Sequence, residues 1–240
     1  MNYNLLKFYI LSCFLTFISC NVKTQTNPQN KKELQTEKVN IIFLIGDGMG
    51  LSQLSSAYFY GEKEPNFSRF PFVGLSKTRS GSHKITDSAA GATAFSTGKK
   101  TYNGAIGVDM DTTAVETITE ELAKNDWSIG FVSTSSITHA TPASFYSHVS
   151  SRLMQQEIAK DLVNSDVDFI AGGGYNWFIN RTDSLNYFDS LEQKGFFVDT
   201  NSVLTPPDKN QDKLAFLLSP DGMQAKHLGR DNFLTDATTR

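Results

Sequence analysis

A serine and a carboxylate stand side by side at the start of a run of very small residues. In "TDSAAGATAFSTG" (86–98), Asp87 directly precedes Ser88, and alanines and a glycine follow. Either residue suits a helix N-cap, and residues 89–94 favour a helix. The free N–H groups and the dipole at a helix N-terminus favour negative charge, such as an alkoxide or a bound phosphate. The stretch predicts a nucleophilic serine with room for a tetrahedral anion; the alternative is a capped helix packed tightly in the core.

A free serine hydroxyl is a poor nucleophile, so Ser88 needs an activating group. Histidine is the usual one, and no Gly-x-Ser-x-Gly turn surrounds Ser88. The four histidines of the chain are His83, His139, His148 and His227. A metal ion is the other means of activation, and Asp47 in "GDGMG" is a hard ligand suited to divalent cations. Asp47 could instead cap the helical segment "MGLSQLSSAYFY" (49–60).

Apolar segments that end in small-residue turns predict the strands that carry these groups. They are "VNIIFLIGDGMG" (39–50), "IGFVSTS" (129–135) and "VDFIAGGG" (167–174). Continuous aliphatic runs of this length are typical of strands buried on both faces. Functional residues of open α/β sheets gather at the carboxyl ends of the strands, which is where Asp47, His139 and Thr141 fall.

Helical patterns lie between these strands. "DTTAVETITEELAKN" (111–125) has a Thr113–Glu116 capping box, and "SSRLMQQEIAKDLVNS" (150–165) has apolar residues at helical spacing. We expect His148 to be a helix residue. The alternation predicts an α/β fold, a three-layer α/β/α sandwich with a mostly parallel sheet. Residues 176–240 are less regular, and no repeat or second domain is evident.

The N-terminus predicts export. Residues 1–19 have the short apolar run of a signal peptide, and "FISC" resembles the lipobox of bacterial lipoproteins. Cleavage before Cys20 would leave a lipidated cysteine on a polar tether, residues 20–38; the alternative is an ordinary cleaved signal. Cys13 and Cys20 are the only cysteines, so the mature chain has no disulfide. We expect a periplasmic protein or a membrane-anchored lipoprotein of a bacterial cell envelope.

Composition excludes some partners. The 240-residue chain has a formal net charge of −3 and no run of five basic residues, so nothing favours nucleic acid as a partner. Its share of hydrophobic residues is ordinary for a globular protein, which allows a sizeable core.

Three blocks in order resemble the N-terminal signature of alkaline phosphatases: "FLIGDGMG", "TDSAAGATAFSTGKKTYNGAIGVD" and "VSTSSITHATPASFYSHVSSR". The resemblance implies the α/β/α sandwich of that family for residues 39–240. It also implies phosphomonoester substrates and a centre with two Zn²⁺ and one Mg²⁺. Family members often dimerise, so a homodimer is allowed, although the sequence gives no evidence for it.

The resemblance also implies a role for each matched residue. Asp47 matches the aspartate that bridges a zinc and the magnesium, and Ser88 matches the nucleophile that becomes phosphoserine and ligates zinc. Thr141 matches a magnesium ligand, and His139 stands where members have aspartate or histidine. Arg152 matches the arginine that clamps the phosphate oxygens, a bidentate task that lysine cannot copy.

The family's remaining zinc ligands come from a later stretch that has no counterpart here. We therefore expect an N-terminal portion of the domain, truncated at the C-terminus, with poor metal retention and no activity alone. The alternative is a non-catalytic, surface-tethered phosphate-binding or interaction protein of the same fold. A sulfatase is disfavoured because no Cys/Ser-x-Pro-x-Arg block lies near Ser88. A phosphodiesterase is disfavoured as well, because these relatives usually place threonine in a different block.

Overall fold

The computed structural model describes residues 39–207 and 211–240. The predicted signal peptide (1–19), Cys20 and the tether (20–38) lie outside the described residues. The chain divides into two compact units, Met1–Ile45 and Gly46–Arg240. The second unit contains every helix and strand of the described residues.

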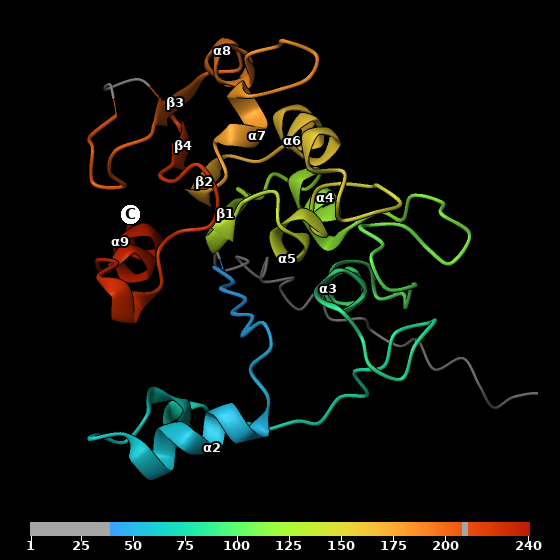
Figure 1. The fold of residues 1–240 in the computed structure, drawn as a ribbon, viewed down its shortest axis with the longest axis vertical. Helices are drawn as coiled ribbons and strands as arrows, with labels where there is room; N and C mark the ends of the chain where they lie inside the picture. The colour runs from blue at the N-terminus through green and yellow to red at the C-terminus, as the bar shows by residue number, and fades with distance from the viewer. Residues whose placement is uncertain (1–38, 208–210) are drawn as a thin grey trace, which may run out of the picture. The chain divides into compact units, whose positions relative to one another are not determined.

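The sheet of this unit has four parallel strands in the order β1-β2-β4-β3 (Figure 1). The strands are β1 (Gly130–Ser136), β2 (Phe169–Gly173), β3 (Phe196–Asp199) and β4 (Lys213–Leu217). Ile170 in β2 pairs with Phe131 on one side and with Ala215 on the other. The predicted parallel sheet is confirmed, and two of its strands lie where the sequence places them. The strands β3 and β4 fall in the part of the sequence with weak periodicity and were not predicted.

Helices precede or connect most of these strands. In chain order, the described residues form α2 (Leu51–Tyr60), α3 (Ser88–Thr97), α4 (Ile118–Ala123), α5 (Ala140–Ala143), α6 (Gln155–Asn164), α7 (Asn176–Ile179), α8 (Tyr187–Gln193) and α9 (Phe233–Thr239), with the 3-10 turns η1 (Asn66–Arg69) and η2 (Lys226–Leu228).

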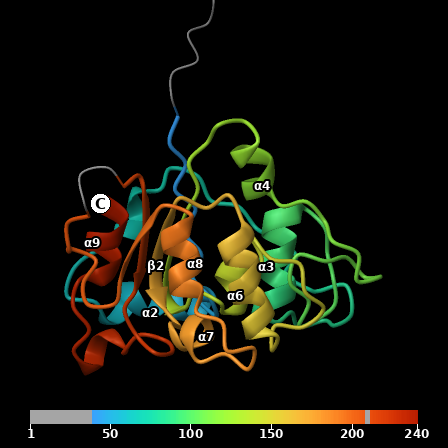
Figure 2. The same ribbon diagram turned by 90° about the horizontal axis from the view of Figure 1, so that it is seen from above.

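The sheet is covered on both faces. Successive residues of a strand point to opposite sides, so neighbouring positions reveal both layers. Ile170 packs in a core with residues of α6, α7 and α8, whereas the next residue, Ala171, packs with Phe216 and with Phe233 of α9. Figures 1 and 2 show α6, α7 and α8 grouped on one side of the sheet and α9 on the other. The predicted α/β/α layering is confirmed.

The predicted first strand is not a strand in this structure. Val39–Ile45 has no regular secondary structure and is absent from the paired strands of the described residues. Its apolar side chains are exposed, for example Ile42 at 68% and Leu44 at 72%. A strand that is buried on both faces needs hydrogen-bonded neighbours and covering layers, and local sequence alone cannot supply them.

Two helices begin later than their patterns predict. The capping box that starts α4 is Thr117–Glu120, not Thr113–Glu116. The Asp109 carboxylate accepts from the Thr113 backbone N–H, which commits that segment to a turn before the helix. Likewise α6 begins at Gln155 rather than Ser150, since Arg152 donates its backbone N–H to the Gly104 carbonyl.

Helix α3 forms where the alanine run predicts it. Asp87 is the N-cap, and its carboxylate accepts from the Ala90 N–H at 3.0 Å. Ala89 is fully buried, and Ser96 donates its hydroxyl to the Ser144 carbonyl directly after α5, against which α3 packs. The small residues of α3 therefore serve tight helix packing, the alternative that the sequence left open.

His148 lies in a loop, not in a helix as expected, and ties that loop to two other segments. Its Nδ1 lies 2.7 Å from the Gly107 carbonyl oxygen and its Nε2 lies 2.9 Å from a Glu120 carboxylate oxygen. Both partners are acceptors, so both contacts are hydrogen bonds only when the ring is doubly protonated. A side chain at Gly107 (φ +58°) would come within 2.1 Å of the Ser147 carbonyl oxygen, so this approach requires glycine.

Burial is the largest effect on the pKa of His148 and lowers it. The hydrogen bonds to Glu120 and Gly107 and the charges of Glu120 and Asp161 outweigh burial, so the net pKa is raised. For Glu120, burial raises the pKa, but the bonds to His148 and Thr117 bring it below its usual value.

The His148–Glu120 pair is expected to stabilise the fold less as pH rises. A raised histidine pKa gives a contribution that is complete below the unfolded-state pKa and lost as pH passes the folded-state value. The contribution should be at most about 1 kcal/mol, because the side chains are 23% and 35% exposed. The difference in unfolding free energy between the native chain and His148→Gln, measured by urea titration from about pH 6 to 9, should shrink. Lys160→Gln, in the exposed pair with Glu157, should show no such trend, and a constant difference for His148→Gln would contradict the expectation.

Within residues 39–207 and 211–240, none of the helices has the length and apolar character needed to cross a membrane.

Candidate active site

The Asp47 carboxylate connects two hydroxyl groups that are distant in sequence. Ser88 donates its Oγ–H to Asp47 Oδ1 at 3.1 Å, and Thr141 donates its Oγ1–H to Asp47 Oδ2 at 2.9 Å. Asp47 is therefore not a cap for α2, whose N-cap is Gly50. The next residue, Gly48, has φ +68°, a conformation that favours glycine and turns the chain sharply after the carboxylate.

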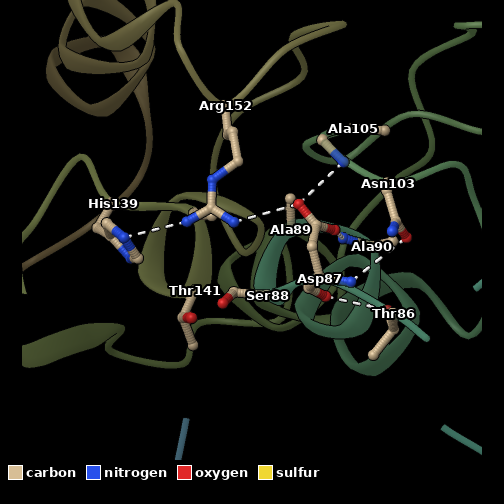
Figure 3. Close-up of polar contacts among 12 residues, drawn as sticks. Thr86, Asp87, Ser88, Ala89, Ala90, Asn103, Ala105, His139, Thr141 and Arg152 are labelled. Atoms are coloured by element: carbon tan, nitrogen blue, oxygen red, sulfur yellow. Dashed lines mark hydrogen bonds and ion pairs between the residues drawn. The ribbon is translucent and has the colours of Figure 1, made fainter. Parts of the chain in front are cut away.

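Each hydroxyl is held by the start of a helix. Ser88 is the first residue of α3, and Thr141 belongs to α5, which follows the carboxyl end of β1. Their placement agrees with the rule that functional groups of an open α/β sheet gather at the strand ends. Figure 3 shows the Ser88 and Thr141 side chains on the same side of the Arg152 guanidinium.

The Arg152 guanidinium lies between two side chains that fix its plane (Figure 3). It donates to Asp87 Oδ2 at 3.1 Å and to His139 Nε2 at 3.0 Å. Its backbone is held as well, since Arg152 N–H donates to the Gly104 carbonyl at 2.8 Å. The group has more N–H donors than these two side-chain bonds use, so it remains able to bind an oxyanion.

Asp87 acts both as a helix cap and as the carboxylate partner of Arg152. It accepts from the backbone N–H groups of Ala90 and Gly104, each at 3.0 Å. Burial raises the pKa of Asp87, but these bonds and the positive Arg152 outweigh that effect, so the pKa lies below its usual value. The sequence identified Asp87 as a cap only; its place beside Ser88 was the one signal of a second role.

His139 is neutral in this arrangement. Burial lowers the pKa of its imidazole, the positive charge of Arg152 lowers it further, and the charge of Asp47 acts in the opposite direction. A guanidinium can only donate, so His139 Nε2 must accept and the ring proton must reside on Nδ1. In this position Nε2 is occupied by Arg152, and any bond from that nitrogen to a cation would require Arg152 to release it.

The structure thus brings together all five residues that the sequence singled out. Asp47, Ser88 and Thr141 form one hydrogen-bonded set. Arg152 binds both His139 and Asp87, the neighbour of Ser88, and these three residues form a second set. The other histidines lie elsewhere: exposed His83 contacts Ser82, and His227 lies in η2.

The oxygen donors around Asp47 fit part of a metal centre. A carboxylate with two hydroxyls nearby suits a hard cation such as Mg²⁺. Zinc sites need several nitrogen, sulfur or carboxylate ligands. The described part of the chain has no group of three or more His, Cys, Asp or Glu side chains arranged to hold a metal ion. The described residues therefore supply more of the ligands of a magnesium site than of a zinc site.

Comparison with known proteins agrees with this geometry. Residues 38–234 match the family described as alkaline phosphatase. This chain belongs to the alkaline phosphatase family. It is 35% identical over 232 residues to alkaline phosphatase 4 of Bacillus subtilis and 38% identical over 233 residues to alkaline phosphatase 3 of the same organism. Each match covers 90% of this chain but 49% of the relative.

A solved alkaline phosphatase has the same fold. The enzyme of the Antarctic bacterium TAB5 superimposes with a TM-score of 0.77 at 48% identity, over 80% of this chain and 56% of that one. A histidine-to-aspartate mutant of the TAB5 enzyme has Mg bound in its M3 site. The chain spans about half the length of the alkaline phosphatases it matches.

Proposed function

We propose that this chain supplies the nucleophile and the phosphate clamp of an enzyme that hydrolyses phosphomonoesters through a phosphoserine at Ser88. The single observation that carries the proposal is the Asp47 carboxylate, which accepts hydrogen bonds from both Ser88 and Thr141. It places the serine hydroxyl beside an anionic oxygen ligand, the arrangement that a cation-activated nucleophile requires.

The chemistry divides between the side chains. Ser88 Oγ gives up its proton and attacks phosphorus, the bond from phosphorus to the ester oxygen breaks, and that oxygen takes a proton from water and leaves as the alcohol. Arg152, held by Asp87, binds two non-bridging phosphoryl oxygens through N–H groups. Water then cleaves the bond from phosphorus to Ser88 and releases phosphate. Two Zn²⁺ and one Mg²⁺, when bound, would favour the serine alkoxide and stabilise the leaving oxygen.

Asp47, Ser88, Thr141 and His139 are the proposed contributions of this chain to the metal ligands, His139 through Nε2 after Arg152 has released that nitrogen. Asp47 would bridge zinc and magnesium, Ser88 would bind zinc and Thr141 would bind magnesium. The described residues supply too few zinc ligands for an active centre, so we propose that the 240-residue chain alone is inactive.

The experiment uses two proteins. One is the 240-residue chain, and the other is a chimera in which residues 39–240 are joined to the part of the TAB5 enzyme that this chain does not match. The chain alone should hydrolyse no p-nitrophenyl phosphate with added Zn²⁺ and Mg²⁺, whereas the chimera should do so and lose activity with EDTA. EDTA-sensitive turnover by the chain alone would refute the proposed division. A folded, metal-loaded chimera without turnover would favour a non-catalytic phosphate-binding or surface-tethered interaction protein.

His139 is proposed to tune the magnesium side of the centre. In the chimera, His139→Asp replaces a neutral ring with an anionic oxygen ligand next to Thr141, and added charge strengthens binding of a hard cation. Half-maximal activation should then require roughly tenfold less Mg²⁺ in a magnesium titration of the activity, with a larger total stimulation. His227→Asp, at an exposed position in η2, is the matched control. An unchanged magnesium response would argue against a role for His139.

We also propose export to the cell envelope, with lipid on Cys20 as the membrane attachment. The support is the apolar run of residues 1–19 and the "FISC" sequence. Labelling with palmitate that persists in Cys20→Ala would exclude the lipid anchor.

A further inference from the structure

Positive charge is concentrated in the part of the chain that carries the nucleophile. Between Glu64 and Asp109 there is one acidic residue, Asp87, although the whole chain has a net charge of −3. The basic residues of the same interval are Arg69, Lys77, Arg79, Lys84, Lys99 and Lys100. Such separation of charge produces a local positive potential on a protein that is acidic as a whole.

These charges have no acidic partners within the described residues. The ion pairs found in residues 39–207 and 211–240 involve other cations, and Asp87 is already paired with Arg152. The five basic residues from Lys77 to Lys100 are all exposed. Their charge is therefore available to a ligand in solution.

Hydrogen bonds join the two segments that carry these five residues, 77–84 and 99–100. The Lys100 ammonium donates to the carbonyl oxygens of Lys77, at 2.8 Å, and of Arg79. Gly81 N–H donates to the Thr101 carbonyl at 2.7 Å, which continues the contact between the two segments. We call Lys77, Arg79, Lys84, Lys99 and Lys100 the basic surface.

The segment that carries Lys84 is hydrogen-bonded to the turn that holds the nucleophile. Asn103 donates its side-chain amide to the Ile85 carbonyl, next to Lys84, at 3.1 Å. The same side chain accepts from the Asp87 N–H at 3.3 Å, one residue before Ser88 (Figure 3). Asn103 thus joins the segment that carries Lys84 to the cap of α3.

We propose that the basic surface binds further phosphate groups of the substrate, so that the preferred phosphomonoesters have leaving groups that are themselves phosphorylated. This inference rests on the proposed function, because Ser88 and Arg152 take the phosphoryl group that is transferred. Clustered like charges repel one another, and a polyanion that bridges them relieves the repulsion. A substrate with one phosphate gains nothing from this surface, whereas a polyphosphate offers several negative charges to it.

The test measures binding of inorganic tripolyphosphate to the 240-residue chain by calorimetry in metal-free buffer of low ionic strength. The variant Lys77→Ala/Lys84→Ala/Lys99→Ala removes three exposed charges and leaves Lys100, whose ammonium holds the backbone. The control, Lys160→Ala/Lys194→Ala/Lys226→Ala, removes the same charge elsewhere. The first variant should bind about tenfold more weakly and the control less than about twofold, with the native affinity falling as salt is added.

Equal weakening in the two triple variants would overturn the proposal, because net charge alone would then explain binding. Absence of tripolyphosphate binding to the native chain would also overturn it. Circular dichroism establishes that each variant is folded. The single substitution Lys84→Glu repeats the binding test with one residue altered instead of three. Failure of the proposed function has a separate readout, the absence of phosphate on Ser88 in the chimera, which leaves the binding result intact.

Discussion

Ser88→Ala in the chimera is expected to abolish hydrolysis of p-nitrophenyl phosphate, with a fall in kcat of at least about a thousandfold. Alanine keeps the start of α3, because the cap is the Asp87 carboxylate and not the serine hydroxyl. The loss should therefore reflect the missing nucleophile rather than a disturbed helix. Arg152 and its partners would remain in place, so binding of inorganic phosphate should persist.

Two measurements decide this prediction. Steady-state kinetics gives kcat, and mass spectrometry after acid quenching should find phosphate on the Ser88 peptide of the parent chimera and none in the variant. Ser56→Ala is the matched control, since Ser56 lies exposed in α2 and donates to the Gln53 carbonyl. Turnover by Ser88→Ala at the parental rate would eliminate the phosphoserine pathway.

Arg181→Met is expected to lower the free energy of unfolding of the chain by about 3 kcal/mol. The Arg181 side chain is 1% exposed and donates to both carboxylate oxygens of Asp183. It also donates to the Gln156 carbonyl of α6 at 2.7 Å and to the Trp177 carbonyl of α7 at 3.2 Å. Its guanidinium lies 4.0 Å from the ring centre of Tyr187, the first residue of α8.

One buried cation therefore joins three helices of the same layer. Methionine keeps much of the volume but leaves two carbonyl groups without their donor, which is the main source of the expected loss. Urea titration should show the change, or a fall in the melting midpoint of about 6 to 12 °C. Lys160→Met, at an exposed position in α6, is the control and should change stability little. A loss as small as that of the control would mean that the Arg181 contacts are not net stabilising.

The position of Ser88 at the start of a helix was more predictable than the contacts around it. Ser88 was identifiable because local chemistry determines its place: a capping carboxylate, a helix-forming alanine run and a glycine that ends the helix at Gly98. Asp47, His139 and Thr141 follow from their positions after apolar runs. The Asp87–Arg152 ion pair was not identifiable, because its two ends are 65 positions apart and each had a sufficient local explanation.

The other errors have two causes, a local turn before α4 and strand pairing between segments distant in sequence. The Thr113 N–H binds Asp109 and Thr117 caps instead, so the start of α4 depends on a turn that the capping rule does not consider. β3 and β4 are short and gain their definition from pairing with each other, for example Phe197 with Leu214. Val39–Ile45 has the composition of a buried strand, but composition does not provide the neighbours.

The tight seam between α3 and α5 determines more than local packing. Ser88 stands on one of these helices and Thr141 on the other, and the buried Ala89, Thr93 and Ser144 keep the two backbones close. The size of these buried side chains thus sets the distance between the Ser88 and Thr141 hydroxyls, which the Asp47 carboxylate bridges. Adding methyl groups to that seam would move the two hydroxyls apart, and the Asp47 carboxylate would then no longer reach both of them.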